Sequence, residues 1–294
     1  MIFGVGFLES RRKDMKYLVV GAKGQLGQEL VKLLMERNFD YISYGSTELD
    51  ITDRNKVFEI FKKEKPDVIL DAAAYTAVDK AESEGKDINW LVNVEGTKNL
   101  AEAAKEINAT LIFVSTDYVF DGTKVGSYLE TDIVNPQNEY GKAKLAGERA
   151  VLKSGSKYFI IRTSWVFGEF GNNFVHTMQR LGRDLDTVKV VNDQYGRPTW
   201  TRTLAEFMLH LIATTPEQGV YNLSNDGTAT WYEFANEILR DENVTVLPVT
   251  STEFPTSATR PKNSVLDLQK SKDTGFNIPT WIEALHLFEQ SEAL

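Results

Sequence analysis

The stretch EYGKAKLAGE, residues 139–148, contains one tyrosine and two lysines that could act together. On a helix, residues four apart lie on one face, whereas residues two apart point to nearly opposite sides. This spacing pairs Tyr140 with Lys144 rather than with Lys142. An ammonium group beside a phenol favours the phenolate, so such a pair lowers the tyrosine pKa from about 10 and makes the tyrosine a better proton donor.

A pair of hydroxyl side chains ends a neighbouring apolar segment. The run FVSTDYVF closes a predicted strand with Ser115 and Thr116. Adjacent strand residues face opposite ways, so we expect only one of the two hydroxyls to point toward Tyr140, and the sequence leaves open which one. A hydroxyl, a tyrosine and a lysine that converge could bind a carbonyl oxygen and protonate it, as reduction of a ketone by a nicotinamide requires.

A glycine-rich turn follows the first predicted strand. It reads G-x-x-G-x-x-G and opens a helix. Glycines there permit a tight turn, a close approach of backbone N–H groups to a pyrophosphate, and close packing of the helix on the sheet. The predicted dinucleotide-binding residues of this turn are Gly21, Lys23, Gly24, Gln25, Leu26 and Gly27.

The end of the second predicted strand bears on which nicotinamide cofactor binds. Residues 43–46 read SYGS and contain no carboxylate to hold a ribose 2′-hydroxyl, so a 2′-phosphate is permitted. We therefore predict NADPH, with NADH also possible, and expect Ser46 and Lys23 to contact the 2′-phosphate. Asp50 and Ile51 are expected to meet the adenine, although Asp50 could equally cap the following helix.

Strands and helices alternate over residues 16–168, which positions these groups. Apolar residues at helical spacing separate β-branched runs, and the connections are short. We predict an α/β fold, a Rossmann-type doubly wound parallel sheet with right-handed crossovers. The predicted strands are 16–20, 41–44, 67–75, 109–120 and 157–168, and the later predicted helices are 52–63, 93–107 and 140–151.

The second half of the chain is less regular. Polar loops such as GEFGNNF, VVNDQYGRPTW and SATRPKNSVLD separate shorter elements, and late loops of this kind usually cap the carboxyl edge of the sheet, where ligands bind. We expect a dinucleotide-binding domain over 15–165, with 187–225 packing on it. Residues 166–186 and 226–294 are expected to form mainly a smaller substrate-binding lobe, and residues 1–14 an extension outside the fold.

Composition excludes several classes of protein. The 294 residues carry a formal net charge of −9, which argues against sequence-independent binding of nucleic acid. There is no cysteine, so disulfides, thiolate metal sites and a cysteine nucleophile are excluded. No segment is long enough to predict a membrane span, and the first residues do not read as a secretory signal, so we expect a cytoplasmic protein.

Six motifs together resemble a known family: GAKGQLG, DAAAYTAVDKAE, NVEGTKNLA, STDYVFDG, YGKAKLAGE and RTSWVFGEFGNNFV. From Met15 onward the chain resembles the extended short-chain dehydrogenase/reductase superfamily and, within it, the dTDP-4-dehydrorhamnose reductase family. STDYVFDG and YGKAKLAGE carry the closer resemblance. It implies NAD(P)H-dependent reduction of the 4-keto group of dTDP-4-dehydro-6-deoxy-L-mannose to dTDP-L-rhamnose, the final step of dTDP-rhamnose biosynthesis.

The resemblance also implies roles for individual residues. Thr116 matches the hydroxyl that binds the keto oxygen, Tyr140 the proton donor and Lys144 the lysine that tunes it. Aromatic residues matching the sugar pocket are Tyr118 and Trp165, and the small residues matching the segment along the cofactor are Ala72, Ala73 and Ala74. For the rest of the nucleotide sugar we predict contacts from Asn172, Asn173, Arg197 and Arg260, since the arginine fork suits a diphosphate.

Other readings stay open at this point. A related nucleotide-sugar reductase or epimerase would use the same three catalytic groups. The regulatory subunit of methionine adenosyltransferase resembles the same family and is a binding partner instead. Some family members are metal-bridged dimers through glutamates, and Glu29 matches one such position; without a full set of ligands we predict no required metal, and a homodimer as a possibility.

Overall fold

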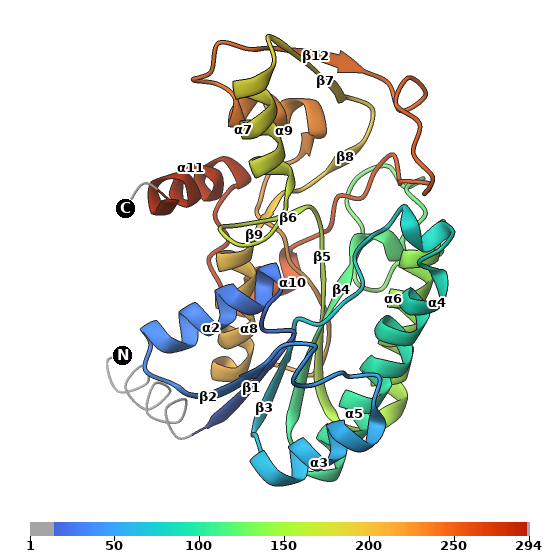
Figure 1. Cartoon of the computed structure of the whole chain (residues 1–294), viewed down its shortest axis with the longest axis vertical. Coiled ribbons are helices and arrows are strands. Elements are labelled where there is room, and N and C mark those ends of the chain that lie inside the picture. Colours follow the sequence, from blue (N-terminus) through green and yellow to red (C-terminus); the bar gives the residue numbers. More distant parts are fainter. Residues whose placement is uncertain (1–14, 293–294) are drawn as a thin grey trace.

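The computed structural model describes residues 15–292, so the expectation for residues 1–14 lies outside the described residues (Figure 1). A six-stranded parallel sheet forms its centre, in the order β2-β1-β3-β4-β5-β10. The strands are β1 Lys16–Val20, β2 Asp40–Tyr44, β3 Val68–Asp71, β4 Thr110–Thr116, β5 Lys157–Thr163 and β10 Gly219–Asn222. The predicted doubly wound sheet is confirmed.

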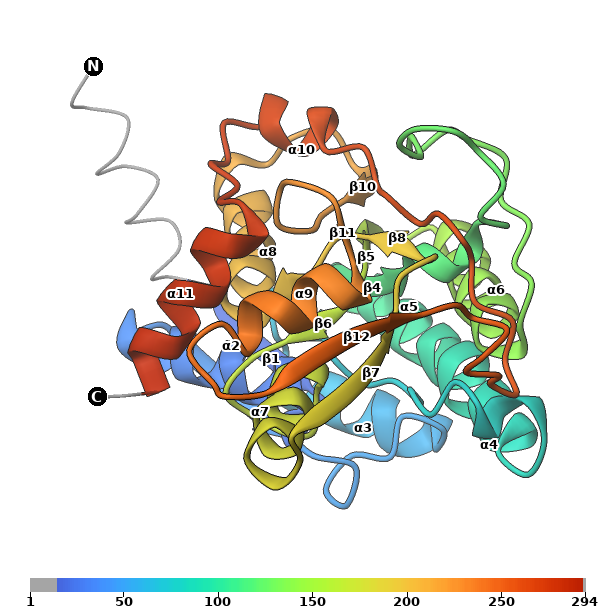
Figure 2. The same cartoon turned by 90° about the horizontal axis from the view of Figure 1, so that it is seen from above.

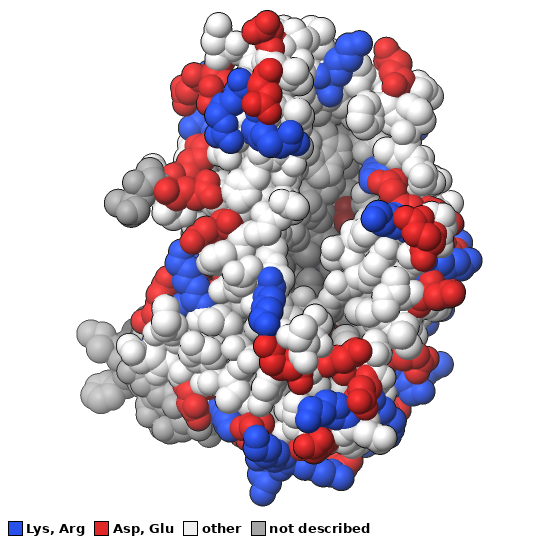
Figure 3. Space-filling model, viewed as in Figure 1, with Lys and Arg blue, Asp and Glu red and all other residues white. Residues whose placement is uncertain are grey.

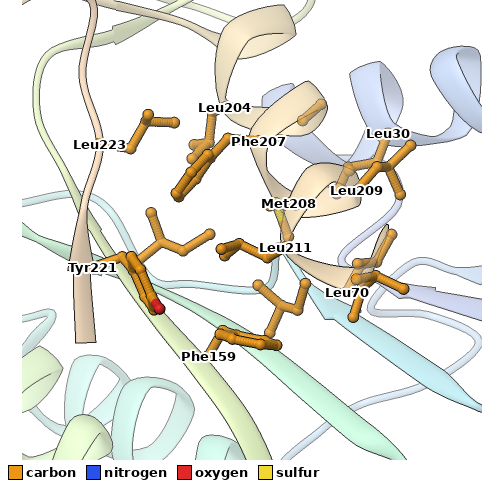
Figure 4. Close-up of a cluster of buried hydrophobic side chains, with 14 of the residues drawn as sticks. Leu30, Leu70, Phe159, Leu204, Phe207, Met208, Leu209, Leu211, Tyr221 and Leu223 are labelled. Carbon is orange, nitrogen blue, oxygen red and sulfur yellow. The ribbon is translucent and has the colours of Figure 1, made fainter. Parts of the chain in front are cut away.

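Helices cover both faces of this sheet. On one face lie α2 Gln25–Glu36 and α8 Thr201–Thr214, and on the other lie α3 Arg54–Glu64, α5 Thr97–Glu106 and α6 Glu139–Ser154 (Figure 1). Figure 4 shows the apolar cluster in which α8 side chains such as Phe207 and Leu211 meet Phe159 and Tyr221 of the sheet. A second cluster, with Phe61, Leu100 and Phe113, fills the opposite face. Burial of apolar area on both faces is the main force that fixes the sheet.

Several predicted elements differ in extent. The predicted strand 109–120 ends at Thr116 and is followed by a 3-10 turn, η3 Asp117–Val119, and the predicted strand 157–168 ends at Thr163, before a separate short strand at Val166–Phe167. The third strand stops at Asp71 rather than continuing to residue 75, and Ala72–Ala74 leave the sheet as an irregular segment. The predicted helix over 93–107 begins earlier, as α4 Lys86–Trp90 followed by a π-helical turn, η2 Leu91–Gly96, before α5. Inside that turn, the buried amide of Asn93 accepts a bond from the backbone N–H of Tyr75 (3.2 Å) and donates one to its carbonyl (3.0 Å). Asn93 therefore fixes the segment that follows β3.

A smaller lobe lies beyond the carboxyl ends of the strands (Figures 1 and 2). Its separate apolar cluster includes Phe167, Val188, Phe234 and Phe288. The lobe contains α7 Phe174–Asp184, β7 Thr187–Val191, α9 Trp231–Ile238, β12 Thr245–Val249 and α11 Trp281–Glu292. Four short strands precede or separate these elements in the chain: β6 Val166–Phe167, β8 Tyr195–Gly196, β9 Thr199–Trp200 and β11 Ala229–Thr230. The short helix α10 Gln269–Asp273 packs on β10 of the main sheet.

The range 187–225 divides between the lobes. Helix α8 packs on α2, and β10 extends the main sheet beside β5. Strand β7 differs from the expectation, because it pairs in parallel with β12 and buries Val188 and Val190 in the small-lobe cluster. The division into a cofactor domain and a substrate lobe stays a prediction.

Within residues 15–292, no helix combines the length and the apolar character needed to cross a membrane.

Candidate active site

A cavity of about 460 Å³ lies at the carboxyl edge of the sheet, between the two lobes. Figure 3 shows the molecule hollowed along this boundary. Ligands of doubly wound sheets bind at this edge. Twelve of the predicted site residues line the cavity: Gly24, Gln25, Leu26, Ala72, Ala73, Ala74, Thr116, Tyr118, Tyr140, Lys144, Trp165 and Asn172.

The glycine turn lets neighbouring backbone segments lie closer to it than side chains would allow. Gly21 has a left-handed backbone (φ 75°), and a Cβ there would lie 2.6 Å from the backbone nitrogen of Ala73. A Cβ on Gly27 would lie 2.1 Å from the carbonyl oxygen of Gly21. Helix α2 starts after Gly24 with no side-chain cap, which leaves backbone N–H groups of its first turn to meet an anion. These features fit the pyrophosphate of a dinucleotide.

A carboxylate does lie near the end of β2, contrary to the reading of residues 43–46. Glu48 accepts a hydrogen bond from the backbone N–H of Gly45 (3.0 Å) and pairs with Lys23 (2.8 Å). The sequence analysis missed this carboxylate because Glu48 lies two residues after the stretch 43–46, and only in the folded chain does its side chain contact that stretch. Lys23 and Ser46 are exposed here, outside the cavity lining.

Of the two residues predicted to contact the adenine, one is buried in the core and the other is exposed. Ile51 is buried in the apolar core, where it packs against Gly96. Asp50 is exposed and accepts a hydrogen bond from the N–H of Thr52 (2.9 Å). The alternative that Asp50 caps α3 is wrong, because Asp53 holds the cap position and accepts from Lys56 (3.0 Å).

Tyr140 enters the cavity from the first turn of α6. Asn138 caps this helix by accepting a hydrogen bond from the N–H of Gly141 (2.7 Å). A Cβ on Gly141 would lie 2.3 Å from the carbonyl oxygen of Tyr118, so the glycine lets the helix approach the end of β4. Burial raises the pKa of Tyr140, the nearby Asp117 carboxylate raises it further, and a hydrogen bond with Thr116 lowers it. A phenol in this setting needs a positive charge to release its proton.

The two hydroxyls at the end of β4 have different partners. Ser115 donates to Glu148 (2.6 Å), which also holds the buried Arg162 through two hydrogen bonds of 2.8 and 2.9 Å. Thr116 donates to the carboxylate of Asp117 (3.0 Å) and accepts from the N–H of Tyr118 (3.2 Å), and its hydroxyl lowers the pKa of the neighbouring Tyr140. This favours Thr116 over Ser115 as the hydroxyl that meets a substrate oxygen.

The two lysines of α6 differ as their spacing predicts. Lys144 is 1% exposed, and its Nζ lies 4.1 Å from the ring centroid of Phe113. Burial lowers the pKa of Lys144 to about 8, against the opposing effects of Asp71 and Glu148. Lys142 instead points to the surface, where it pairs with Glu139 (2.8 Å).

Aromatic rings form the small-lobe side of the cavity. Trp165 adopts a left-handed backbone (φ 47°), and its ring stacks on Trp231 with centroids 3.7 Å apart. On the opposite side, the rings of Tyr118 and Tyr140 meet edge to face, 6.1 Å apart. The sequence analysis missed two residues that line the cavity. Trp231 is 66 residues from Trp165 in the sequence, and Asp117 directly follows Thr116 in STDYVFDG.

Asp117 is nearly fully buried, and its Oδ2 has no hydrogen-bond partner among residues 15–292. Burial raises its pKa to about 6.

The remaining predicted contacts lie outside the cavity lining. Arg260 forms an ion pair with Asp79 (2.7 Å) and lies beside Tyr118. Arg197 pairs with Asp226 (3.2 Å). Asn173 caps α7 and donates to Gln25 (3.0 Å), which ties the small lobe to the glycine turn. Gly21 and Gly27 support that turn from behind.

Glu29, which matches a metal-bridging position, is buried and contacts Arg202 (3.4 Å) and Thr201 (3.3 Å). Over residues 15–292, no cluster of three or more histidine, aspartate or glutamate side chains is placed to hold a metal ion.

The family described as RmlD substrate binding domain matches residues 15–293. The chain belongs to this family. The dTDP-4-dehydrorhamnose reductase of Aggregatibacter actinomycetemcomitans is 43% identical over 285 residues, which cover 92% of this chain and 97% of that protein. These matches confirm the resemblance that the motifs indicated.

Solved structures of RmlD-family reductases share the whole fold. The dTDP-4-dehydrorhamnose reductase of Clostridium acetobutylicum is 43% identical, with a TM-score of 0.92 over 95% of this chain and 100% of that one. The enzyme of Bacillus anthracis, solved in complex with NADP, is 38% identical, with a TM-score of 0.90 over 94% of this chain and 99% of that one.

Proposed function

We propose that this chain reduces the 4-keto group of dTDP-4-dehydro-6-deoxy-L-mannose with NADPH and forms dTDP-L-rhamnose. One observation carries the proposal: Thr116, Tyr140 and Lys144 line the same cavity as the start of the glycine turn. The reductase relatives, one of them holding NADP, support the same reaction and cofactor.

The glycine turn and the N-terminus of α2 would hold the cofactor pyrophosphate, and Ala72–Ala74 would run alongside the cofactor. A bound NADPH supplies the hydride that reduces the keto carbon. Thr116 would donate a hydrogen bond to the keto oxygen, and Tyr140 would give that oxygen its proton as general acid. Lys144, one turn further along α6, would stabilise the phenolate that remains, because a nearby positive charge favours the ionised form that burial of Tyr140 disfavours.

The nucleotide sugar would lie toward the small lobe. We propose Tyr118, Trp165 and Asn172 as contacts of the sugar, with Trp165 held flat against Trp231. Arg260 already lies beside Tyr118, so it is the better placed of the two candidate arginines for a diphosphate. Among residues 15–292, the buried Nε of Arg197 has no hydrogen-bond partner, which makes that side chain a second candidate.

A cytoplasmic location, a homodimer and the absence of nucleic-acid partners remain predictions. The location rests on the substrate class, the homodimer on the family resemblance, and the absence of nucleic-acid partners on the acidic composition.

The test is consumption of reduced nicotinamide, followed by absorbance, with the 4-keto sugar nucleotide supplied by the preceding enzymes. NADPH and NADH are compared side by side, and the product is identified by chromatography. We expect rapid oxidation and dTDP-L-rhamnose. Protein that binds NADPH but oxidises neither cofactor would redirect the proposal to another nucleotide sugar or to a regulatory subunit.

A further inference from the structure

A second buried ionisable group, Asp71, lies in the cavity beside Lys144. Asp71 ends β3 and is 1% exposed. It stands in register with Phe113 of β4, and paired residues of adjacent strands project from the same face of a sheet. The Nζ of Lys144 lies 4.1 Å from the Phe113 ring centroid, on that face. The carboxylate and the ammonium therefore flank one aromatic ring.

The carboxylate of Asp71 is only partly satisfied. Its Oδ1 accepts a hydrogen bond from the backbone N–H of Ala73 (3.0 Å). Its Oδ2 is buried, lines the cavity with Lys144, and has no hydrogen-bond partner within residues 15–292. A buried carboxylate oxygen without a partner is costly, so a function for its charge is expected.

The other carboxylate acting on Lys144 is already neutralised. Glu148, one turn further along α6, is 2% exposed and receives two hydrogen bonds from the guanidinium of Arg162 and one from Ser115. Over the described residues, Asp71 and Glu148 are the ionisable groups whose charge raises the pKa of Lys144, with Tyr140 one turn before it on the same helix. Because Arg162 balances Glu148, Asp71 is the carboxylate whose charge is left for Lys144.

We propose that Asp71 is a positioning residue, the counter-charge that keeps the buried Lys144 protonated and directed at Tyr140. This inference rests on the proposed reductase function and adds a residue to its machinery. Tyr140 needs the ammonium charge to give up its proton, and burial alone opposes that charge.

Both charges coexist near neutral pH. Burial raises the pKa of Asp71 to about 6, and burial lowers that of Lys144 to about 8, so the carboxylate and the ammonium are both ionised between these values. Without the carboxylate, the folded-state pKa of Lys144 falls further. The ammonium is then lost at a lower pH.

The experiment compares Asp71→Asn with Asp71→Ala. Asparagine removes the charge and keeps an oxygen for the N–H of Ala73, whereas alanine removes both. Two quantities are measured against pH for each variant and the parent: kcat/KM for NADPH with the 4-keto sugar nucleotide, and the Kd of NADPH by fluorescence in the absence of substrate. Circular dichroism at pH 6 checks that each variant is folded.

We expect the alkaline midpoint of kcat/KM to move down by roughly one to three pH units in both variants, because a lost opposite charge shifts a neighbouring pKa by that amount. The alkaline weakening of NADPH binding should move in parallel. A structural role alone predicts otherwise: Asp71→Asn would keep both midpoints of the parent, and only Asp71→Ala would be impaired. That result would overturn the proposal.

The binding measurement separates this inference from the proposed function. If the parent protein does not reduce the sugar nucleotide, the proposed reaction fails. The pH dependence of NADPH affinity then still decides for or against Asp71, since a shift in Asp71→Asn supports the counter-charge and an unchanged midpoint refutes it.

Discussion

Replacing Lys144 by methionine, with Lys142→Met as the matched control, separates a buried charge from a surface one on the same helix. Lys144 is 1% exposed and lies over Phe113, whereas the Lys142 side chain is 46% exposed and paired with Glu139. The two substitutions are chemically identical and lie two residues apart. Any difference in activity between the two variants therefore comes from the position of the lysine and not from the loss of a lysine as such.

The magnitude follows from the surroundings of Tyr140. Burial raises its pKa. A neighbouring positive charge typically lowers such a value by about one to three units. At about 1.4 kcal/mol per unit, loss of Lys144 should cost about 1.4–4 kcal/mol of transition-state stabilisation, or roughly 10- to 1000-fold in kcat/KM. The exposed Lys142–Glu139 pair is worth less than about 1 kcal/mol, and it contributes to helix stability rather than to catalysis.

Folding should change little in Lys142→Met. In Lys144→Met, methionine packs well against the aromatic ring, but the buried Asp71 carboxylate loses its counter-charge, which lowers the stability of the fold unless the carboxyl group takes up a proton. Steady-state NADPH oxidation gives kcat/KM, NADPH fluorescence gives Kd, and thermal unfolding gives Tm. We expect Lys144→Met to weaken both catalysis and NADPH binding. Equal effects of the two variants, or normal turnover in Lys144→Met, would refute the helical-face reasoning.

Four further substitutions probe the rest of the site. Tyr140→Phe should keep the Kd for NADPH and lose at least about 10²-fold in kcat, since it removes the proton donor; unchanged turnover would reject that role. Thr116→Val should lose on the order of 10²-fold in kcat. Ser115→Ala should keep its turnover, and denaturant titration should show a free energy of unfolding lower by about 1.5–3 kcal/mol. The reverse pattern would make Ser115 the hydroxyl that binds the keto oxygen. Glu48→Gln should release Lys23 for a 2′-phosphate and raise the ratio of kcat/KM for NADPH over NADH about two- to fivefold, and a fall in that ratio would contradict this view.

Local patterns predicted the parts of this protein that depend on short stretches of chain. Strand and helix periodicity gave the parallel sheet because each element carries its own apolar face. The glycine turn, the spacing of Tyr140 and Lys144, and the alternation of Ser115 and Thr116 concern residues within a few positions of each other. Their relative directions follow from helix and strand geometry alone.

Contacts between distant segments were not predictable in this way. Asp71 and Lys144 come to line one cavity, and Glu148 pairs with Arg162, only after β3, β4, β5 and α6 have packed together. The stacking of Trp165 on Trp231 likewise needs the small lobe in place. A single sequence gives the identity of these residues but not which of them pair, because that depends on tertiary packing rather than on local preference.

The ion pair of Arg260 shows the same limit at the edge of the site. Its position in SATRPKNSVLD predicts a diphosphate contact but gives no sign that Asp79 pairs with its guanidinium. The acidic partner comes from DAAAYTAVDKAE, a motif whose alanines were read for the cofactor. Nothing local to either stretch connects the two.

Transfer of deuterium tests the central claim most directly. The protein is supplied with dTDP-4-dehydro-6-deoxy-L-mannose and, in parallel reactions, with NADPH labelled by deuterium in each of the two hydrogen positions at C4 of the nicotinamide. A net reduction predicts that one labelled form gives dTDP-L-rhamnose with deuterium at C4 of the sugar, seen by mass spectrometry and NMR, with one NADPH consumed per product. Product without deuterium, or a changed sugar with no net loss of NADPH, would contradict the account.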